Sequence, residues 1–140
     1  MTRGITLPIA AFAAALASGF IGLASAQAAT VEPLKAWSGR VPLTERPPLQ
    51  TSIAKESDWT RIWKDCRVQG LAPKVDFQKT LGLVAVRRSS LVEFTGLNLE
   101  DGNLKTNVVV TPDMPDYMSC AIVLIRRTGI RKVNGNPVGQ

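Results

Sequence analysis

The sequence contains no histidine, only two cysteines and a single tyrosine. Without histidine the chain has no imidazole base, so the catalytic triads that use imidazole to activate serine or cysteine are excluded. The usual zinc sites, which combine histidine with cysteine or carboxylate ligands, are excluded as well. These absences remove the commonest hydrolase and zinc-enzyme chemistries from consideration.

Other catalytic and metal-binding motifs are absent or incomplete. The chain has no glycine-rich phosphate loop and no G-x-G-x-x-G motif. Ser52 and Lys55 have the S-x-x-K spacing of serine-lysine acyl enzymes, but the S-D-N and K-T-G elements that accompany it are missing. Asp113 and Asp116 are candidate donors for a hard cation, yet their spacing matches no calcium loop. We therefore expect no metal and no cofactor, and a serine-lysine hydrolase is kept only as an alternative.

Residues 1–26 have the composition of an export signal. Arg3 gives a basic start, a long apolar stretch follows, and residues 24–26 (Ala-Ser-Ala) match the small-residue pattern that signal peptidase cuts. The apolar stretch is long enough to span a bilayer if it is not cut, so a retained anchor is the alternative. We expect cleavage to leave a periplasmic or secreted chain of about 110 residues with no membrane span.

Both cysteines, Cys66 and Cys120, lie in the mature part of the chain. An even cysteine count in an exported protein is typical of a disulfide, and two cysteines allow one intramolecular pairing. In the chain-entropy account, closing a loop of this size stabilises the fold by about 4 kcal/mol. A reactive thiol is the alternative, but the chain has neither a C-x-x-C motif nor a histidine partner.

The mature length suits one domain. We predict an extended N-terminal segment over residues 27–48 and a single α+β domain over residues 49–140. Pro42, Pro47 and Pro48 confine a short strand near residues 37–41 to a sheet edge, because proline lacks the backbone donor that a central strand needs.

The clearest helix pattern covers residues 55–67. Trp59, Ile62, Trp63 and Cys66 recur at the spacing of one helix face. Two tryptophans one turn apart are also compatible with a ligand platform, but beside Ile62 they are typical of a core. We therefore expect this face to pack on a sheet.

The rest of the domain has the pattern of strands. Two nearly uninterrupted apolar runs suggest strands covered on both faces, and Asp101-Gly102 is a strong hairpin signal. The expected fold is α+β, a small antiparallel sheet of about five strands packed on one amphipathic helix, with the disulfide joining helix to sheet. The predicted strands cover residues 81–86, 94–99, 104–110, 120–125 and 130–133.

Basic side chains supply the only repeated polar feature. Arg87-Arg88 and Arg126-Arg127 each end an apolar strand, and loss of Arg3 with the signal lowers the net charge by one, from +6 to +5. If the strands are antiparallel neighbours the pairs lie at opposite ends of the sheet, whereas another arrangement gathers them into an anion-binding patch. Nucleic-acid binding is not expected, because no aromatic residues interleave with the basic ones.

One stretch resembles a known family. Ile53, Trp59, Ile62-Trp63, Val75-Asp76-Phe77 and the strand over residues 81–86 are similar to the opening of the PrcB-like domain, the C-terminal domain of a bacterial protease-complex subunit family. Where that family has a glycine-rich turn, this chain has residues 87–91 without glycine. The resemblance implies an exported, non-catalytic accessory domain that docks onto another protein, and it supplies no catalytic residues.

These observations together predict an exported, non-catalytic domain that binds an envelope or secreted protein, with Arg87, Arg88, Arg126 and Arg127 as candidate docking residues. The alternative is a domain that binds an anionic envelope polymer or lipid through its positive charge.

Overall fold

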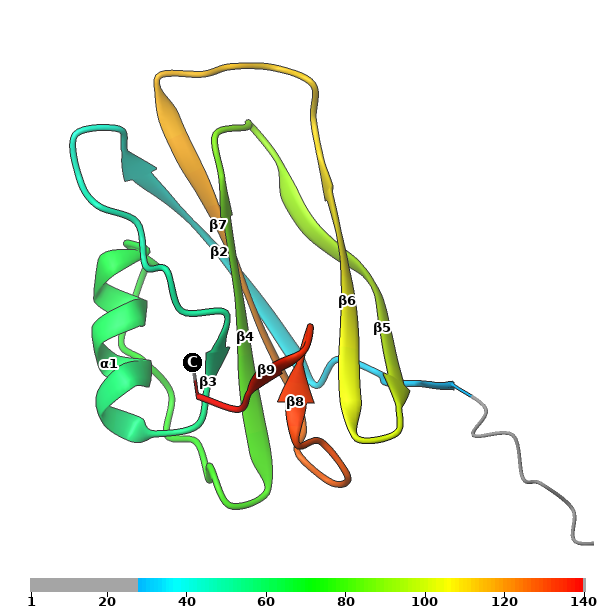
Figure 1. The fold of residues 1–140 in the computed structure, drawn as a ribbon. Coiled ribbons are helices and arrows are strands. Elements are labelled where there is room, and N and C mark those ends of the chain that lie inside the picture. Colours follow the sequence, from blue (N-terminus) through cyan, green and yellow to red (C-terminus); the bar gives the residue numbers. More distant parts are fainter. Residues whose placement is uncertain (1–27, 140) are drawn as a thin grey trace, which may run out of the picture.

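The computed structural model describes residues 28–139, and the predicted signal peptide over residues 1–26 lies outside them. Within the described part no helix is long and apolar enough to cross a membrane. The elements, shown in Figure 1, are β1 (Ala29–Thr30), β2 (Lys35–Pro42), β3 (Ser52–Ile53), α1 (Glu56–Asp65), β4 (Thr80–Arg87), β5 (Val92–Glu100), β6 (Asn103–Val110), β7 (Tyr117–Arg126), β8 (Lys132–Val133) and β9 (Asn136–Pro137).

The strands form two sheets. One has the order β2-β7-β4-β3 and is antiparallel throughout. The other has the order β1-β5-β6-β8-β9, in which β6 and β8 are parallel and the remaining pairs are antiparallel. The predicted α+β class is confirmed. In the first sheet β4 and β7 pair with each other, and the β5–β6 hairpin packs across them.

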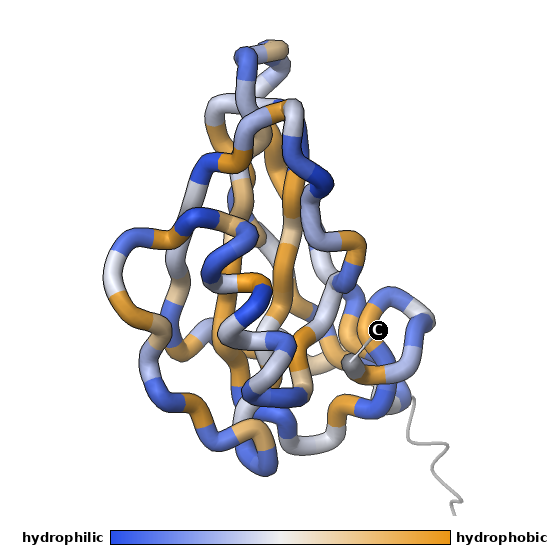
Figure 2. Tube along the Cα trace, turned by 90° about the vertical axis from the view of Figure 1, so that its left-hand side faces the viewer, coloured by the Kyte–Doolittle hydropathy of each residue, from blue (hydrophilic) through white to orange (hydrophobic). Residues whose placement is uncertain are grey.

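Strands β4 and β7 form the middle layer of the molecule. Successive side chains of a strand point to opposite faces, so Val84 and Ile122 pack with α1 while Leu83 and Val123 pack with the second sheet. Figure 1 shows α1 on one side of the four-stranded sheet and the β5–β6 hairpin on the other. Burial on both faces explains the long hydrophobic runs along the central strands in Figure 2.

Helix α1 packs on the sheet through its tryptophans, as the spacing predicts. Trp59 and Trp63 are buried, and their ring centroids lie 5.7 and 5.2 Å from that of Trp37 in β2. The indole N–H groups donate to the carbonyl oxygens of Pro73 and Gly70, each at 3.0 Å. The tryptophans therefore belong to a satisfied core and do not form a ligand platform.

The N-terminal segment over residues 27–48 contributes strands to both sheets. β1 pairs with the end of β5, and β2 pairs with β7 along its whole length. β2 lies at the edge of its sheet, as Pro42 at its end and Pro47 and Pro48 after it predict. Its second edge therefore has no strand partner within the described part of the chain.

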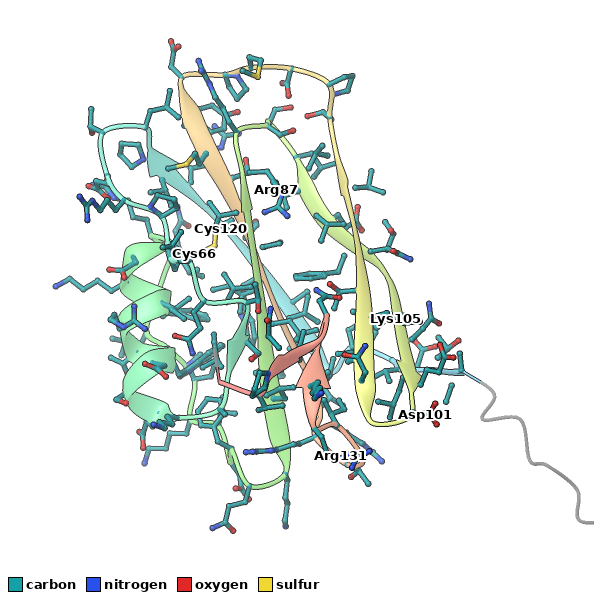
Figure 3. All side chains as sticks on the ribbon, viewed as in Figure 1. Cys66, Arg87, Asp101, Lys105, Cys120 and Arg131 are labelled. Carbon is teal, nitrogen blue, oxygen red and sulfur yellow. A yellow bond between two sulfur atoms is a disulfide. The ribbon has the colours of Figure 1, made fainter. Side chains whose placement is uncertain are left out.

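The predicted disulfide between Cys66 and Cys120 is present and joins the end of α1 to β7 (Figure 3). Cys120 lies opposite Gly39 in the β2–β7 register. A Cβ atom at Gly39 would lie 1.8 Å from the carbonyl oxygen of Cys66. Because a side chain does not fit there, glycine allows β2 to approach the end of α1 closely.

The predicted hairpin at Asp101-Gly102 is also confirmed. Both residues have positive φ, 50° and 77°, as a two-residue turn between antiparallel strands requires. Asn134 and Gly135 repeat this pattern between β8 and β9, with φ values of 48° and 83°. The last strand, predicted over residues 130–133, is limited to its final two residues.

Candidate binding groove

The four arginines predicted as docking residues do not lie together. In the antiparallel β4–β7 pair, Arg126 lies opposite Thr80 and Arg87 lies opposite Ser119. Arg87 and Arg126 are therefore at opposite ends of the sheet, about 23 Å apart at roughly 3.3 Å per residue. A single patch built from both pairs is incompatible with this register, which the sequence alone left open.

Three of these arginines hydrogen-bond to backbone carbonyl oxygens. Two of the bonds reach across to another segment and so hold a loop against the end of the sheet. These side chains lie where the strands end at the solvent, and their hydrogen bonds stabilise the backbone next to those ends. The donor–acceptor pairs are Arg87 with Val86 at 2.8 Å, Arg88 with Pro115 at 2.9 Å and Arg127 with Phe77 at 2.8 Å.

Ser52, the candidate nucleophile of the alternative hydrolase, is fully buried in β3. Its Oγ accepts a hydrogen bond from the backbone N–H of Gly139 at 2.8 Å. Lys55 is exposed at the start of α1. A nucleophile must reach the substrate, and Ser52 instead ties the C-terminal residues to the sheet.

An open groove runs beside β2, and we call it the edge groove. Its walls are residues 37–40 of β2, residues 67–69 after α1 and residues 90–94 at the start of β5. A polar section of about 700 Å³ and an apolar section of about 320 Å³ adjoin each other, because they share the lining residues Trp37, Ser38, Leu91 and Val92. Each volume lies in the range of known ligand sites.

The polar section contains hydroxyl and guanidinium groups. Ser38 and Arg40 are exposed on β2, and Ser90 and Ser119 add hydroxyls to the lining. The guanidinium carbon of Arg40 lies 4.5 Å from the centroid of the Tyr117 ring, a cation–π contact that orients the side chain. Within residues 28–139 no carboxylate lies at ion-pair distance from Arg40. Arg40 therefore brings an unpaired positive charge to the groove.

Arg67, in the same section, has a left-handed backbone conformation with φ of 51°. Arg67 directly follows Cys66, the C-cap residue of α1. Two backbone hydrogen bonds close the end of the helix at this point. The N–H of Arg67 donates to the carbonyl oxygen of Lys64 at 3.0 Å, and that of Val68 donates to Trp63 at 3.3 Å. This is the Schellman pattern, in which glycine usually occupies the left-handed position.

An arginine is unusual at this position. The other non-glycine residues with positive φ in the described chain are Asp101 and Asn134, types that tolerate the conformation in turns. For a residue with a Cβ the left-handed conformation costs about 1 kcal/mol. Arg67 also forms an exposed ion pair with Glu45, which offsets at most part of that cost. A strained arginine beside a groove is consistent with a functional role for its side chain.

The apolar section lies between the edges of the two sheets. Ala36 of β2, Phe94 of β5 and Val123 of β7 contribute to its lining. Leu91 in the lining is 49% exposed, and Glu93 is the one charged residue that the described part of the chain adds to this section. This section is therefore an apolar recess that opens to solvent.

Hydrogen bonds between two loops fix the wall that carries Ser90. The Asp113 carboxylate accepts hydrogen bonds from the Ser90 N–H at 2.9 Å and from the Thr111 hydroxyl at 2.6 Å. The Ser90 hydroxyl, followed by the Thr111 hydroxyl and the Ser90 N–H, holds the pKa of the Asp113 carboxyl well below its usual range, because these donors stabilise the charged form. Ser119 Oγ donates to the carbonyl oxygen of Ser89 at 2.6 Å. The β4–β5 turn is thus bound to the β6–β7 loop.

Among residues 28–139, no three histidine, cysteine, aspartate or glutamate side chains gather closely enough to hold a metal ion. A comparison with protein-family models, with curated proteins and with solved structures found no match to this chain. The geometry of the edge groove is therefore the basis for assigning a function.

The sequence patterns did not indicate the residues that line this groove. Most of them come from four segments far apart in the chain, over residues 36–40, 67–69, 90–94 and 119–123. Gly39 carried one usable signal, because a glycine inside a strand indicates the close approach of another backbone. No sequence signal indicated Arg67, because its left-handed conformation depends on how the helix ends.

Proposed function

We propose that the mature domain is an exported binding module that docks onto an envelope or secreted protein through the edge groove, without catalysing a reaction. The observation that supports this function most is Arg40 of the open edge strand β2, which is exposed and has no ion-pair partner within residues 28–139. Arg40 lines the polar section, next to the apolar recess. A cleft that combines an apolar recess with a few placed polar groups is typical of ligand recognition.

Two further observations favour an exported accessory role. Disulfides persist in oxidising compartments outside the cytoplasm, and Cys66 and Cys120 form one. The resemblance to the PrcB-like domain implies docking onto another protein. By contrast, the split arginine pairs disperse the basic charge, which disfavours a polymer or lipid binder that acts through one basic surface.

Site-specific photo-crosslinking in intact cells of the source organism tests this function. A photo-reactive amino acid replaces Ser38 in the edge groove, and a matched variant carries it at Ser57, which is exposed on α1. We expect the Ser38 probe to capture one exported protein and the Ser57 probe not to. Because a shape-specific interface is only weakly screened, capture should persist from about 0.05 to 0.5 M salt.

Two results would contradict the proposed function. Heterogeneous capture that disappears at high salt, with either probe, would identify a binder of anionic polymers. No difference between the Ser38 and Ser57 probes would show that the edge groove is not the docking surface.

A further inference from the structure

Strand β2 is an open edge with few of the features that usually protect one. It has eight residues, whereas the edge strands β1, β3 and β9 have two each. Its register with β7 contains no bulge, and its one proline, Pro42, is its last residue. Natural sheet edges are usually short, bulged, interrupted by proline or marked by charged side chains. Of these features β2 has the charges of Lys35 and Arg40 and the terminal Pro42. β2 is therefore a long and regular template for one more strand.

The neighbouring edge of β5 is a poorer template. β5 pairs with β1 only near its C-terminal end, so among residues 28–139 its first half also has an open side. A register shift between Phe94 and Gly96 interrupts that half, and bulges disrupt the regular spacing of backbone donors and acceptors. An incoming strand is thus favoured on β2.

A strand added to β2 would place its side chains in register with the edge groove. Alternate side chains of a strand point to the same face, so those on the groove side would follow Ala36, Ser38 and Arg40. An apolar side chain beside Ala36 fits the recess that includes Phe94, and a carboxylate fits near Arg40. Building on the proposed function, we infer that its partner contributes an extended acidic segment that pairs with β2 as an additional strand.

Charge distinguishes this occupant from a second copy of the chain. β2 contains Lys35 and Arg40 and no acidic residue. Two β2 strands paired edge to edge would gather four cations with no carboxylate in either strand, and like charges on adjacent strands are destabilising. A strand with aspartate or glutamate near Arg40 replaces this repulsion with attraction.

The backbone part of the inference is tested with dodecapeptides displayed on phage and selected against the mature domain. The most enriched acidic peptide is then synthesised in two forms, each N-methylated at every second residue. An added strand directs alternate N–H groups toward its neighbour. We expect one form to bind at least about tenfold more weakly and the other to change less than about twofold.

The charge part is tested with Arg40→Glu and with Arg126→Glu, which makes the same change at an exposed position at the far end of the sheet. We expect Arg40→Glu to weaken binding of the acidic peptide by at least about tenfold, and a lysine in place of the key acidic residue to restore it. Arg126→Glu should change the affinity less than about twofold.

Strand addition is rejected if no groove-binding peptide is enriched, if the two N-methylated forms bind equally, or if both arginine variants weaken binding equally. Dimerisation of the mature domain through β2 would identify a second copy as the occupant and also overturn the inference. If the Ser38 probe captures one protein but the two N-methylated peptides bind equally, only strand addition is rejected and the proposed function stands. If the Ser38 probe captures no protein, the proposed function itself is rejected.

Discussion

The carbonyl oxygen of Cys66 occupies the place that a side chain at Gly39 would need, 1.8 Å from the ideal Cβ position. Cys66 is also bonded to Cys120, which lies opposite Gly39 in the neighbouring strand. The end of α1, β2 and β7 therefore meet at one point. Gly39 and Cys120 both line the polar section of the edge groove, so its shape depends on this contact.

Gly39→Ala should destabilise the domain by about 2–3 kcal/mol, because the methyl group would meet a backbone atom that the disulfide holds in place. Gly96→Ala is a matched control, since its methyl group would meet the end of the flexible Asn107 side chain at 3.0 Å. We expect that variant to lose less than about 1 kcal/mol. Urea denaturation of both measures the difference, and equal losses would contradict the close contact.

Reduction of the Cys66–Cys120 disulfide should lower the melting temperature by at least about 10 °C. The bridge spans 54 residues, and a loop of that size contributes about 4 kcal/mol in the chain-entropy account. Native protein should show no reactive thiol until it is unfolded and reduced. A variant with both cysteines replaced by alanine serves as the control, because its melting temperature should not respond to the reductant. Two titratable thiols in the native protein would contradict the bridge.

Replacing Arg67 separates its backbone cost from its side-chain role. Arg67→Gly relieves the left-handed strain, whereas Arg67→Ala keeps it, and both remove the ion pair with Glu45. We expect the glycine variant to be more stable than the alanine variant by about 1 kcal/mol. If the side chain takes part in docking, both variants should bind the selected acidic peptide equally weakly. An alanine variant as stable as the glycine variant would argue against strain at this position.

The Asp113 network predicts a stability difference that depends on pH. The pKa of Asp113 is lower in the folded chain than its usual value of 3.8, so the charged form stabilises the fold and this contribution is present above that pH. The stability advantage over Asp113→Asn should stay constant near neutral pH and shrink as the pH falls below about 4. Ser90→Ala should weaken this dependence, because the Ser90 hydroxyl is the largest contributor. Parallel stability curves for wild type and Asp113→Asn would contradict the assignment.

The local elements of the fold were accessible from the sequence because each has its own periodic signal. Trp59, Trp63 and Cys66 defined the buried face of α1, and Asp101-Gly102 defined the turn between β5 and β6. The cysteine count predicted the disulfide. In each case the physical cause acts over a few residues or through a unique pairing.

The arrangement of the strands and the edge groove was not accessible in this way. A strand buried on both faces loses its alternation, so its sequence does not indicate which strands are its neighbours. Arg87 and Arg126 therefore had two possible arrangements until the β4–β7 register was known. The groove forms between segments that meet only after the sheets pack, and neither Arg40 nor Ser90 belongs to a motif that shows this.

The most direct test of the edge groove is amide hydrogen exchange of the mature domain with and without the selected acidic peptide. Docking on β2 predicts that the outward-facing amides of β2 become at least about tenfold more protected, while the amides of α1 do not change. Protection confined to residues 87–88 or 126–127, with none on β2, would contradict the account and return attention to the arginine pairs.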